Sequence, residues 1–408
     1  MDHETETSSR HRGSECAITG AYGVPQRLPA AQRAMRLSWA WFPVTMSTGS
    51  IAVLLSQQPF RFHGLNTIGR VVFIIDIVLF VIFSFLISLR FLRSPRALLR
   101  SLHDPSECFF FGAFLASMAL ILYCMAAYGV RGLDGHGAWL ISALRVLFWI
   151  YFACATLVAV FQCTYGIILV VGNQVIFSTE KLDYSQAVPA WVFPAFPFLF
   201  TGPLAAEIAS TQPNHHAVRI IIAGITGQGL GWMLALLIYN VYFLRLIKSD
   251  PPPPSQRPGM YISVGPAAYT CAGLIALGQQ AKQKLPARYL GLTTAYAGDV
   301  WYAIAVAAGL FLWMVAVWFS LLTTLQVLRG MKKMRFSLQW WAWVFPNAGL
   351  ALATIQIGRA LDSDGFKGVG SGLTILLCLI WLICAGFHIS AILKHDILSP
   401  GKDPGVDR

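Results

Sequence analysis

Small hydroxylated and polar side chains gather around prolines inside apolar stretches of this sequence. They are Thr45, Ser47 and Thr48 after Pro43, Ser263, Tyr269 and Thr270 around Pro266, and Asn347 after Pro346. A proline lacks the backbone N–H and disrupts a helix, and a membrane tolerates such a break where protein or a water-filled cavity satisfies the freed groups. Hydroxyl donors bind a passing carboxylate weakly, as conduction requires. The pattern predicts a polar path for an anion; the alternative is that each hydroxyl bonds within its own helix or to a neighbour.

The composition is that of a protein with many membrane-spanning helices. Of 408 residues, 56% are hydrophobic and 12% are charged, against about 25% charged residues in a soluble domain. The charges lie between long apolar blocks, each able to cross about 30 Å as a helix. Ten spans are predicted, at about 37–57, 68–92, 107–128, 138–170, 189–209, 217–247, 259–279, 299–328, 338–359 and 370–394.

The charge distribution predicts the orientation of these spans. The net charge is +12, and its Lys and Arg residues lie at the ends of apolar segments, so we expect no nucleic-acid partner. Basic clusters occupy the connections 90–100, 245–257 and 329–335, which share a side with both termini if there are ten spans. Because basic loops stay in the cytosol, both termini are predicted to be cytosolic. The expected domains are a disordered tail over 1–34, a transport domain over 35–395 and a tail over 396–408.

A repeat relates the odd-numbered spans. Pro43, Pro194, Pro266 and Pro346 fall in the first, fifth, seventh and ninth spans, and Gly112 takes the corresponding place in the third. A helical hairpin therefore recurs at a period of roughly 70–80 residues. The odd spans are rich in Gly, Ala, Ser and Thr, whereas the even ones are rich in Ile, Leu, Val and Phe. We expect an all-α integral membrane fold of ten helices, in which five hairpins form a quasi-fivefold ring around a central pore.

Aromatic residues directly before these breaks are candidates for a gate. Phe193 and Phe345 each precede a proline, and Phe42 and Phe111 hold similar places. A ring fixed at such a break can project onto the axis and occlude it, although ordinary packing explains most aromatic residues in an apolar protein.

Charges within apolar spans are costly and therefore informative. Asp76 and Arg145 fall in two even spans, so a structural ion pair between them is expected. Arg359, at the end of an odd span, is the residue expected to attract an anionic substrate, while Glu207 and Arg219 are interfacial or line an outer vestibule. His388 is expected to be packed rather than to carry protons.

Catalytic and metal-binding signatures are missing from the sequence. It contains no P-loop, no GxSxG or HExxH motif, and no Cys/His cluster at metal spacing, so neither enzyme activity nor a cofactor or metal is expected. A membrane-embedded enzyme or sensor remains an alternative, and Asp76, Arg145 and His388 are the titratable residues that it could use.

Several stretches resemble the tellurite-resistance/dicarboxylate transporter family, in particular its fungal malic acid permease branch. They are the run from Trp39-Ala-Trp-Phe-Pro43 to Leu55, Gln58-Pro-Phe60, Leu65-Asn-Thr-Ile-Gly69, Arg257 to Thr270, and Trp340-Trp-Ala-Trp-Val-Phe-Pro-Asn347. The resemblance covers about 36–395. Because the third span has Gly112 in place of proline, no gate or substrate role is carried over to it.

The resemblance implies the fold shared with plant slow anion channels, in which a phenylalanine of the ninth helix blocks the pore; here that is Phe345. It implies transport of malate or related C4 dicarboxylates across the plasma membrane, and often a homotrimer with one pore per subunit. The alternative is efflux of sulfite or of an acidic secondary metabolite by the same fold.

Overall fold

The protein is built from helices. The computed structural model describes Pro29 and residues 33–130, 137–168, 187–286, 288–292 and 296–398, and no strand occurs among them. The predicted tails, 1–34 and 396–408, lie almost entirely outside the described residues. Eight of the described helical segments are long and apolar enough to cross a membrane. The all-helical membrane class predicted from the composition is therefore confirmed.

Five helices are buried within the bundle. They are α2 (Phe42–Ser56), α6 (Phe111–Cys124), α9 (Thr201–Thr211), α11 (Val264–Lys284) and α13 (Phe345–Ala360). Every residue of α2 is buried, although α2 carries five serine, threonine and glycine residues between Thr45 and Ser50. Small side chains let helix backbones approach closely, which explains why these sequences pack inside. We call these five the inner helices.

Five longer helices cover the inner ones. They are α3 (Leu65–Arg93), α7 (Ala138–Ile168), α10 (Asn214–Lys248), α12 (Ala297–Gly330) and α14 (Asp364–Leu393). In their most apolar windows only 22% to 44% of residues are buried, against 72% to 89% in the segments that contain α6, α9 and α11. The side chains that they expose are mainly Ile, Leu, Val, Phe and Trp. An apolar surface of this extent fits lipid rather than water.

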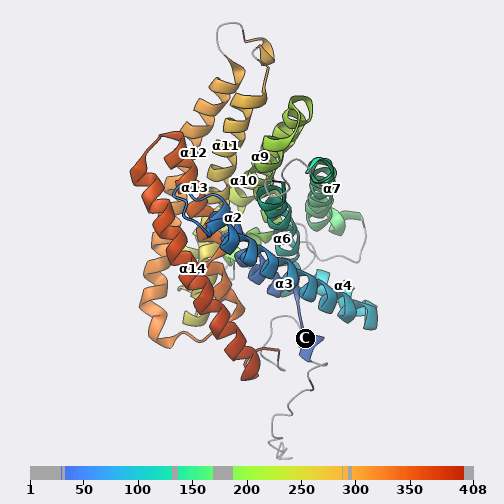
Figure 1. Ribbon diagram of the computed structural model, residues 1–408. Helices are drawn as coiled ribbons and strands as arrows, with labels where there is room; N and C mark the ends of the chain where they lie inside the picture. Colours follow the sequence, from blue (N-terminus) through green and yellow to red (C-terminus); the bar gives the residue numbers. More distant parts are fainter. Residues whose placement is uncertain are drawn as a thin grey trace, which may run out of the picture.

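Contacts between the inner helices follow the order of the chain. Helix α2 contacts α6, α6 contacts α9, α9 contacts α11, and α11 contacts α13, which returns to α2. Each outer helix packs on the inner helix that precedes it in the chain and also contacts the inner helix that follows. For α14, the last helix, that second partner is α2. Figure 1 shows α2 in the middle of the bundle, with α12 and α14 on one flank and α7 on the other.

Tight 3₁₀ segments lead into four of the inner helices or their short extensions. They are η1 (Trp39–Trp41), η5 (Pro189–Ala195), η6 (Pro254–Ser263) and η9 (Leu338–Trp343), and η5 continues into the one-turn helix α8 (Phe196–Leu199). Pro43 and Pro346 each stand in the first turn of an α-helix; α2 follows η1 directly, and one residue separates η9 from α13. Proline suits that turn, because the N–H that it lacks would have no partner within the helix. Pro266 is the third residue of α11, and Pro194 lies within η5.

Short elements join the long helices. They are α4 (Pro95–His103), α5 (Pro105–Cys108), the π-helical turn η2 (Met125–Gly129), η7 (Tyr289–Gly291) and η8 (Met331–Lys333). The start of the described chain lies against the end of α14, because Arg33 donates a 2.6 Å hydrogen bond to the carbonyl of Ile392. Arg90, at the end of α3, donates to the carbonyl of Leu37 just before η1. The start of the described chain, the end of α3 and the end of α14 therefore lie on one side of the bundle.

Candidate functional site

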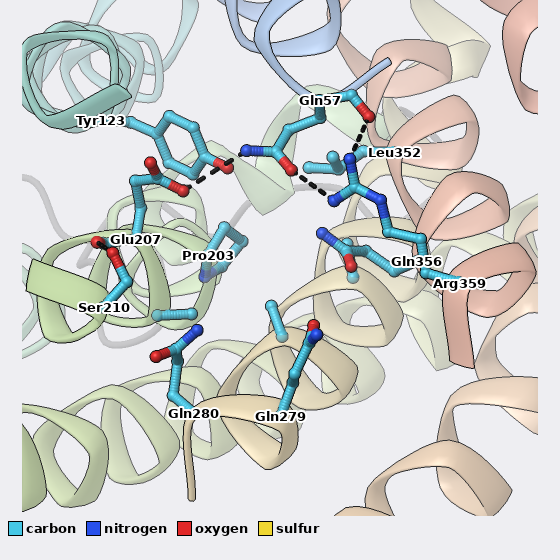
Figure 2. A pocket seen from close by; sticks show the side chains of 13 residues that line it. Gln57, Tyr123, Pro203, Glu207, Ser210, Gln279, Gln280, Leu352, Gln356 and Arg359 are labelled. Carbon is cyan, nitrogen blue, oxygen red and sulfur yellow. Dashed lines mark hydrogen bonds between the residues drawn. The ribbon is translucent and has the colours of Figure 1, made fainter. Parts of the chain in front are cut away.

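All five inner helices contribute to one cavity, which we call the five-helix cavity. Its volume is about 140 Å³. The lining residues are Gln57, Tyr123, Pro203, Ala206, Glu207, Ser210, Ala272, Ala276, Gln279, Gln280, Leu352, Gln356 and Arg359. They come from α6, α9, α11 and α13 and from the residue after α2. Gln57, Tyr123, Ser210, Gln280 and Arg359 stand near the C-terminal ends of these helices, so the cavity lies toward the side away from η1 and η9. Figure 2 shows amide, carboxylate and guanidinium groups facing one another across it.

A polar chain crosses the cavity. Arg359 donates to the side-chain oxygen of Gln57 at 2.7 Å and to its backbone carbonyl at 2.6 Å. The Gln57 amide nitrogen donates in turn to Glu207 at 3.3 Å (Figure 2). One guanidinium is therefore separated from one carboxylate by a neutral amide. The predicted substrate residue Arg359 lies in the cavity wall, and so does Glu207, whereas Arg219 is an exposed residue of α10.

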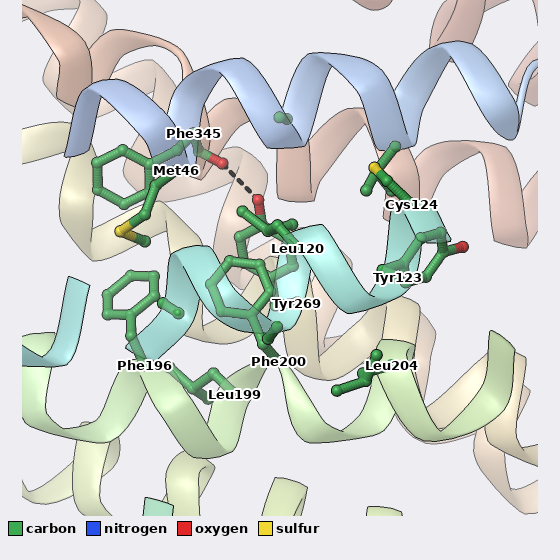
Figure 3. Close-up of a cluster of buried hydrophobic side chains, with 14 of the residues drawn as sticks. Met46, Leu120, Tyr123, Cys124, Phe196, Leu199, Phe200, Leu204, Tyr269 and Phe345 are labelled. Atoms are coloured by element: carbon green, nitrogen blue, oxygen red, sulfur yellow. Dashed lines mark hydrogen bonds between the residues drawn. The ribbon is translucent and has the colours of Figure 1, made fainter. Parts of the chain in front are cut away.

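Between the cavity and the N-terminal ends of the inner helices, aromatic side chains fill the space between these helices. The ring of Phe345 lies 5.8 Å from that of Phe193 and 5.6 Å from that of Phe196, measured between centroids. Phe200 lies 4.3 Å from Tyr269 by the same measure. We call these five residues the aromatic plug. Phe193, Phe196 and Phe345 are fully buried, and Figure 3 shows Met46 beside the Phe345 ring.

Tyr269 fixes the plug to two neighbouring helices. Its hydroxyl donates a 2.7 Å hydrogen bond to the carbonyl of Phe345 and lies 3.1 Å from the Ser50 hydroxyl on α2. Its ring leaves no room for a side chain at Gly349, where a Cβ would come within 2.8 Å of it. Tyr269 precedes the cavity residue Ala272 by one helical turn. The plug therefore lies directly beneath the floor of the cavity.

The predicted hydroxyl residues of α2 join helices in this conformation. Thr45 donates to the Phe42 carbonyl and lies 2.7 Å from the Ser117 hydroxyl on α6. Ser47 donates to the Trp341 carbonyl at 3.0 Å, and Thr48 donates to Val44 while accepting from Trp381 on α14. Thr45, Ser47 and Thr48 thus point toward three different neighbours. Met46 and Ser50, one turn apart, share the face that meets the plug.

The other predicted polar residues also make contacts between helices. Thr270 donates to the Pro266 carbonyl and accepts from Gln228 of α10 at 2.9 Å. Asn347 donates to the Trp343 carbonyl and accepts from Ser320 of α12. Ser263 donates to the carbonyl of Met260. None of these three is among the lining residues of the five-helix cavity as far as the described chain extends.

The prediction of an ion pair between Asp76 and Arg145 is wrong. Asp76 is fully buried on α3, and neither carboxylate oxygen has a hydrogen-bond partner among the described residues. Its carboxylate lies against the backbone of Gly49, so that it faces α2, whereas Arg145 is a half-buried residue of α7. The sequence could place both residues in apolar spans but not on facing helices. His388, by contrast, is packed as expected: it accepts a 2.9 Å hydrogen bond from Trp341 and lies against Trp41.

Sequence reasoning missed the amides of the cavity and two of the five residues of the plug. Gln57, Gln279, Gln280 and Gln356 stand near the ends of inner helices, where a polar residue usually marks the membrane boundary. Four amides at one level, on three otherwise apolar repeats, were the available signal. Phe196 and Phe200 follow Phe193 in the fifth span, and their spacing of three to four residues places them along one helix face.

No group of three or more metal-ligating side chains occurs in the described residues. The cavity lining instead holds one guanidinium, one carboxylate and several amides, groups that can hydrogen-bond a small polar ligand.

Comparison with known proteins agrees with this chemistry. The chain is 33% identical over 380 residues to a malic acid transport protein of Schizosaccharomyces pombe, covering 92% of this chain and 83% of that protein. It is 27% identical to the sulfite efflux pump SSU1 of Trichophyton rubrum, over 84% of this chain and 87% of the pump. A stretch of 103 residues is 33% identical to the S-type anion channel SLAH3 of Arabidopsis thaliana, covering 25% of this chain and 13% of that channel. The model of the SLAC1 family, voltage-dependent anion channels, matches residues 36–389, and the chain therefore belongs to this family of multi-pass membrane proteins.

Proposed function

We propose that the protein moves organic acid anions, malate or related C4 dicarboxylates, across a membrane along the axis between its inner helices. One observation carries the proposal: all five inner helices contribute to one cavity, which holds Arg359 and is closed below by aromatic rings. The identity to a malic acid transport protein supports this choice of substrate.

In this proposal the ten helices form five hairpins in a quasi-fivefold ring. The closed order of contacts from α2 through α6, α9, α11 and α13 supports it. Helices α2 and α13 are 15 and 16 residues long, and each is extended by a 3₁₀ segment at its start. With these extensions, Trp39–Ser56 and Leu338–Ala360 complete the set of ten spans.

Arg359 gives the anion its first binding site. A carboxylate that enters the cavity takes the place of the Gln57 side-chain oxygen at the guanidinium, and so exchanges a neutral acceptor for a charged one. The nearby Glu207 carboxylate limits the attraction, so that the anion is held without being trapped. Conduction needs binding that is strong enough for entry and weak enough for release.

Phe345 and Phe193 form the gate in this proposal. The two rings contact each other and seal the axis beneath the cavity, so passage requires at least one of them to move. Tyr269 bonds to the backbone of Phe345, which couples α11 to the gate. Once the rings have moved, the Ser50 hydroxyl, which lies 3.1 Å from the Tyr269 hydroxyl in the closed state, supplies a weak donor along the path.

The orientation follows from charge. The basic connections after α3, α10 and α12 lie on the side of η1 and of the end of α14, and we place that side in the cytosol. The five-helix cavity then faces the outside of the cell. Residence in the plasma membrane and assembly as a homotrimer belong to the same proposal.

Efflux of sulfite is the second candidate function, favoured by the 27% identity to a sulfite efflux pump. The purified protein should be reconstituted in liposomes and tested for uptake of labelled malate, succinate, fumarate and sulfite against protein-free liposomes. The proposal predicts that malate enters faster than sulfite. Uptake of sulfite alone would establish the second candidate, and no uptake of any of these acids would reject both.

A further inference from the structure

Helix α4 (Pro95–His103) leads away from the end of a transmembrane helix and is little covered by the rest of the protein. It follows α3 after one residue, Ser94, whose extended backbone and following proline end α3 and start a new helix. Its main contacts are with α3 and with the short α5. Figure 1 shows α4 at the edge of the bundle, beyond the end of α3. Because a membrane span ends there, α4 begins at the boundary between lipid and water.

The side chains of α4 form a basic stripe and an apolar stripe. Arg96 and Arg100 stand one turn apart and are both exposed. Leu98 and Leu102, each two residues after an arginine, are each 38% exposed. Since each residue advances about 100° around a helix, the leucine stripe lies about 200° from the arginine stripe. A helix with one basic and one apolar side fits a membrane surface, because its apolar side can enter the acyl chains while its basic side meets the headgroups.

One residue of α4 determines which way the two stripes face. The hydroxyl of Ser101 accepts a 3.3 Å hydrogen bond from the indole of Trp39, and the Ser101 side chain is 1% exposed. Around the helix, Ser101 lies between the two stripes, about 100° from Arg100 on one side and from Leu102 on the other. Helix α4 therefore turns Ser101 to the bundle and leaves both stripes accessible from outside.

The arginines of this region have no acidic partner in the part of the chain that the structure describes. Arg93, Arg96 and Arg100 form no ion pair or side-chain hydrogen bond there. Glu107, which follows α4, is already paired with Arg90 at 2.6 Å. Three positive charges close together thus remain for an anion from outside the chain. The phosphate group of an anionic phospholipid matches them, because guanidinium groups bind phosphate oxygens by paired hydrogen bonds.

A bilayer fits α4 better than a soluble protein that takes up amphipathic helices. Such a protein encloses its target helix in a groove. Here Ser101 is buried against Trp39, and α3 and α5 hold the two ends of α4, so the helix cannot be enclosed without breaking these contacts. A membrane surface needs only the two accessible stripes.

We infer that α4 lies in the membrane interface and binds anionic phospholipid, with Leu98 and Leu102 among the acyl chains and arginines at the phosphate groups. The arginines are Arg93, Arg96 and Arg100. This surface adjoins η1 through Trp39, on the side of the bundle away from the five-helix cavity. The inference therefore holds whichever anion the protein transports.

The test is hydrogen–deuterium exchange of peptides covering residues 95–103, measured on the full-length protein in nanodiscs. One set of nanodiscs contains phosphatidylcholine alone, and the other contains phosphatidylcholine mixed with phosphatidylserine. Phosphatidylserine should slow the exchange of the α4 amides, because a bound ligand stabilises the folded helix. High salt should weaken this slowing, since it screens exposed charges.

Two pairs of substitutions test the two stripes. Each arginine near an anionic surface strengthens binding roughly fivefold. Arg96→Gln/Arg100→Gln should therefore lower the affinity roughly 25-fold and abolish most of the slowing. Leu98→Ser/Leu102→Ser should also reduce the slowing, because the apolar side no longer enters the acyl chains. Exchange in α2, which is buried throughout, verifies that each variant is folded, and Arg93→Gln replaces the arginine pair should that pair fail to fold.

A matched control separates α4 from the net charge of this side of the bundle. Lys332→Gln/Lys333→Gln removes two exposed positive charges from η8, after α12, and should leave the slowing in α4 unchanged. Glycerophosphoserine, the headgroup without acyl chains, serves as a soluble probe and should slow the exchange far less than the lipid does.

Each result supports or overturns the inference. Equal exchange of the wild type in the two kinds of nanodisc overturns it and leaves a protein partner as the occupant of α4. An equal loss of slowing in the arginine and lysine pairs overturns it as well, because net charge then explains the effect. Equal slowing by glycerophosphoserine and by the lipid, or full slowing in the folded leucine pair, contradicts a position in the membrane interface.

Discussion

The hydroxyl of Tyr269 on α11 donates a 2.7 Å hydrogen bond to the backbone carbonyl of Phe345 on α13. This contact joins two inner helices at the level of the aromatic plug and holds the first turn of α13 in place. Phe345 begins α13, two residues after the end of η9, so its carbonyl lies close to the junction of the two segments. A single hydroxyl thus stabilises the closed position of the proposed gate.

Replacing Tyr269 by phenylalanine should loosen that gate. Tyr269→Phe removes the bond and retains the ring, and one such bond contributes about 0.5–1.5 kcal/mol. Malate uptake by proteoliposomes should rise by about two- to tenfold if the bond favours the closed state. Tyr261→Phe is the control, since the Tyr261 hydroxyl bonds to Thr324 on α12. An equal change in both variants would speak against a specific role for Tyr269.

Gly112 should tolerate no side chain. A Cβ there would lie 2.1 Å from the backbone oxygen of Phe193, and a backbone atom cannot move aside cheaply. Gly112→Ala should lower stability by about 1–3 kcal/mol, measured as thermal unfolding of the purified protein. Gly386→Ala on α14 should raise it slightly, because nothing lies within 4 Å of the added carbon and alanine favours a helix. Equal unfolding temperatures for the two variants would refute this reading of the contact.

Arg359 should control the affinity for the anion. A hydrogen bond to a charged group contributes about 1.5–3 kcal/mol, so Arg359→Gln should raise the concentration for half-maximal uptake by roughly 10- to 100-fold. The half-maximal concentration of Arg359→Lys should lie between those of the wild type and Arg359→Gln, because lysine keeps the charge but loses the paired donors. Arg61→Gln is the control: Arg61 donates to the carbonyl of Ser56 outside the cavity lining. If Arg359→Gln had the same half-maximal concentration as the wild type, Arg359 would not bind the anion.

Glu107 should make stability depend on pH. Burial raises the pKa of its carboxyl above the usual 4.5, and Arg90, 2.6 Å away, offsets part of this rise. A folded-state pKa above the unfolded one gives stability that is present at low pH and lost as the pH rises through the folded pKa. The wild type should therefore lose stability relative to Glu107→Gln as the pH rises over the range above the usual pKa of 4.5. Unfolding temperatures that differ by a constant amount over this range would contradict the prediction.

Apolar blocks and proline spacing predicted which helices are buried, because residue composition differs between buried and lipid-facing helices. These features could not predict which way each side chain of α2 points. One residue turns about 100° around a helix, and α2 is apolar or small on every side, so nothing in its sequence selects the face with Met46 and Ser50 over the face with Thr45. Arg359 and Gln57 lie far apart in the chain, and only the packing of α13 against α2 brings them together.

The central claim is that anions cross along the axis that Phe345 closes. Phe345→Ala removes a fully buried ring from the plug, and Phe345→Leu is a milder variant should the alanine variant fail to fold. The most direct measurement is uptake of labelled malate into proteoliposomes containing equal amounts of folded wild type and variant. The account predicts faster uptake through either variant than through the wild type; unchanged uptake through folded Phe345→Ala or Phe345→Leu would contradict it.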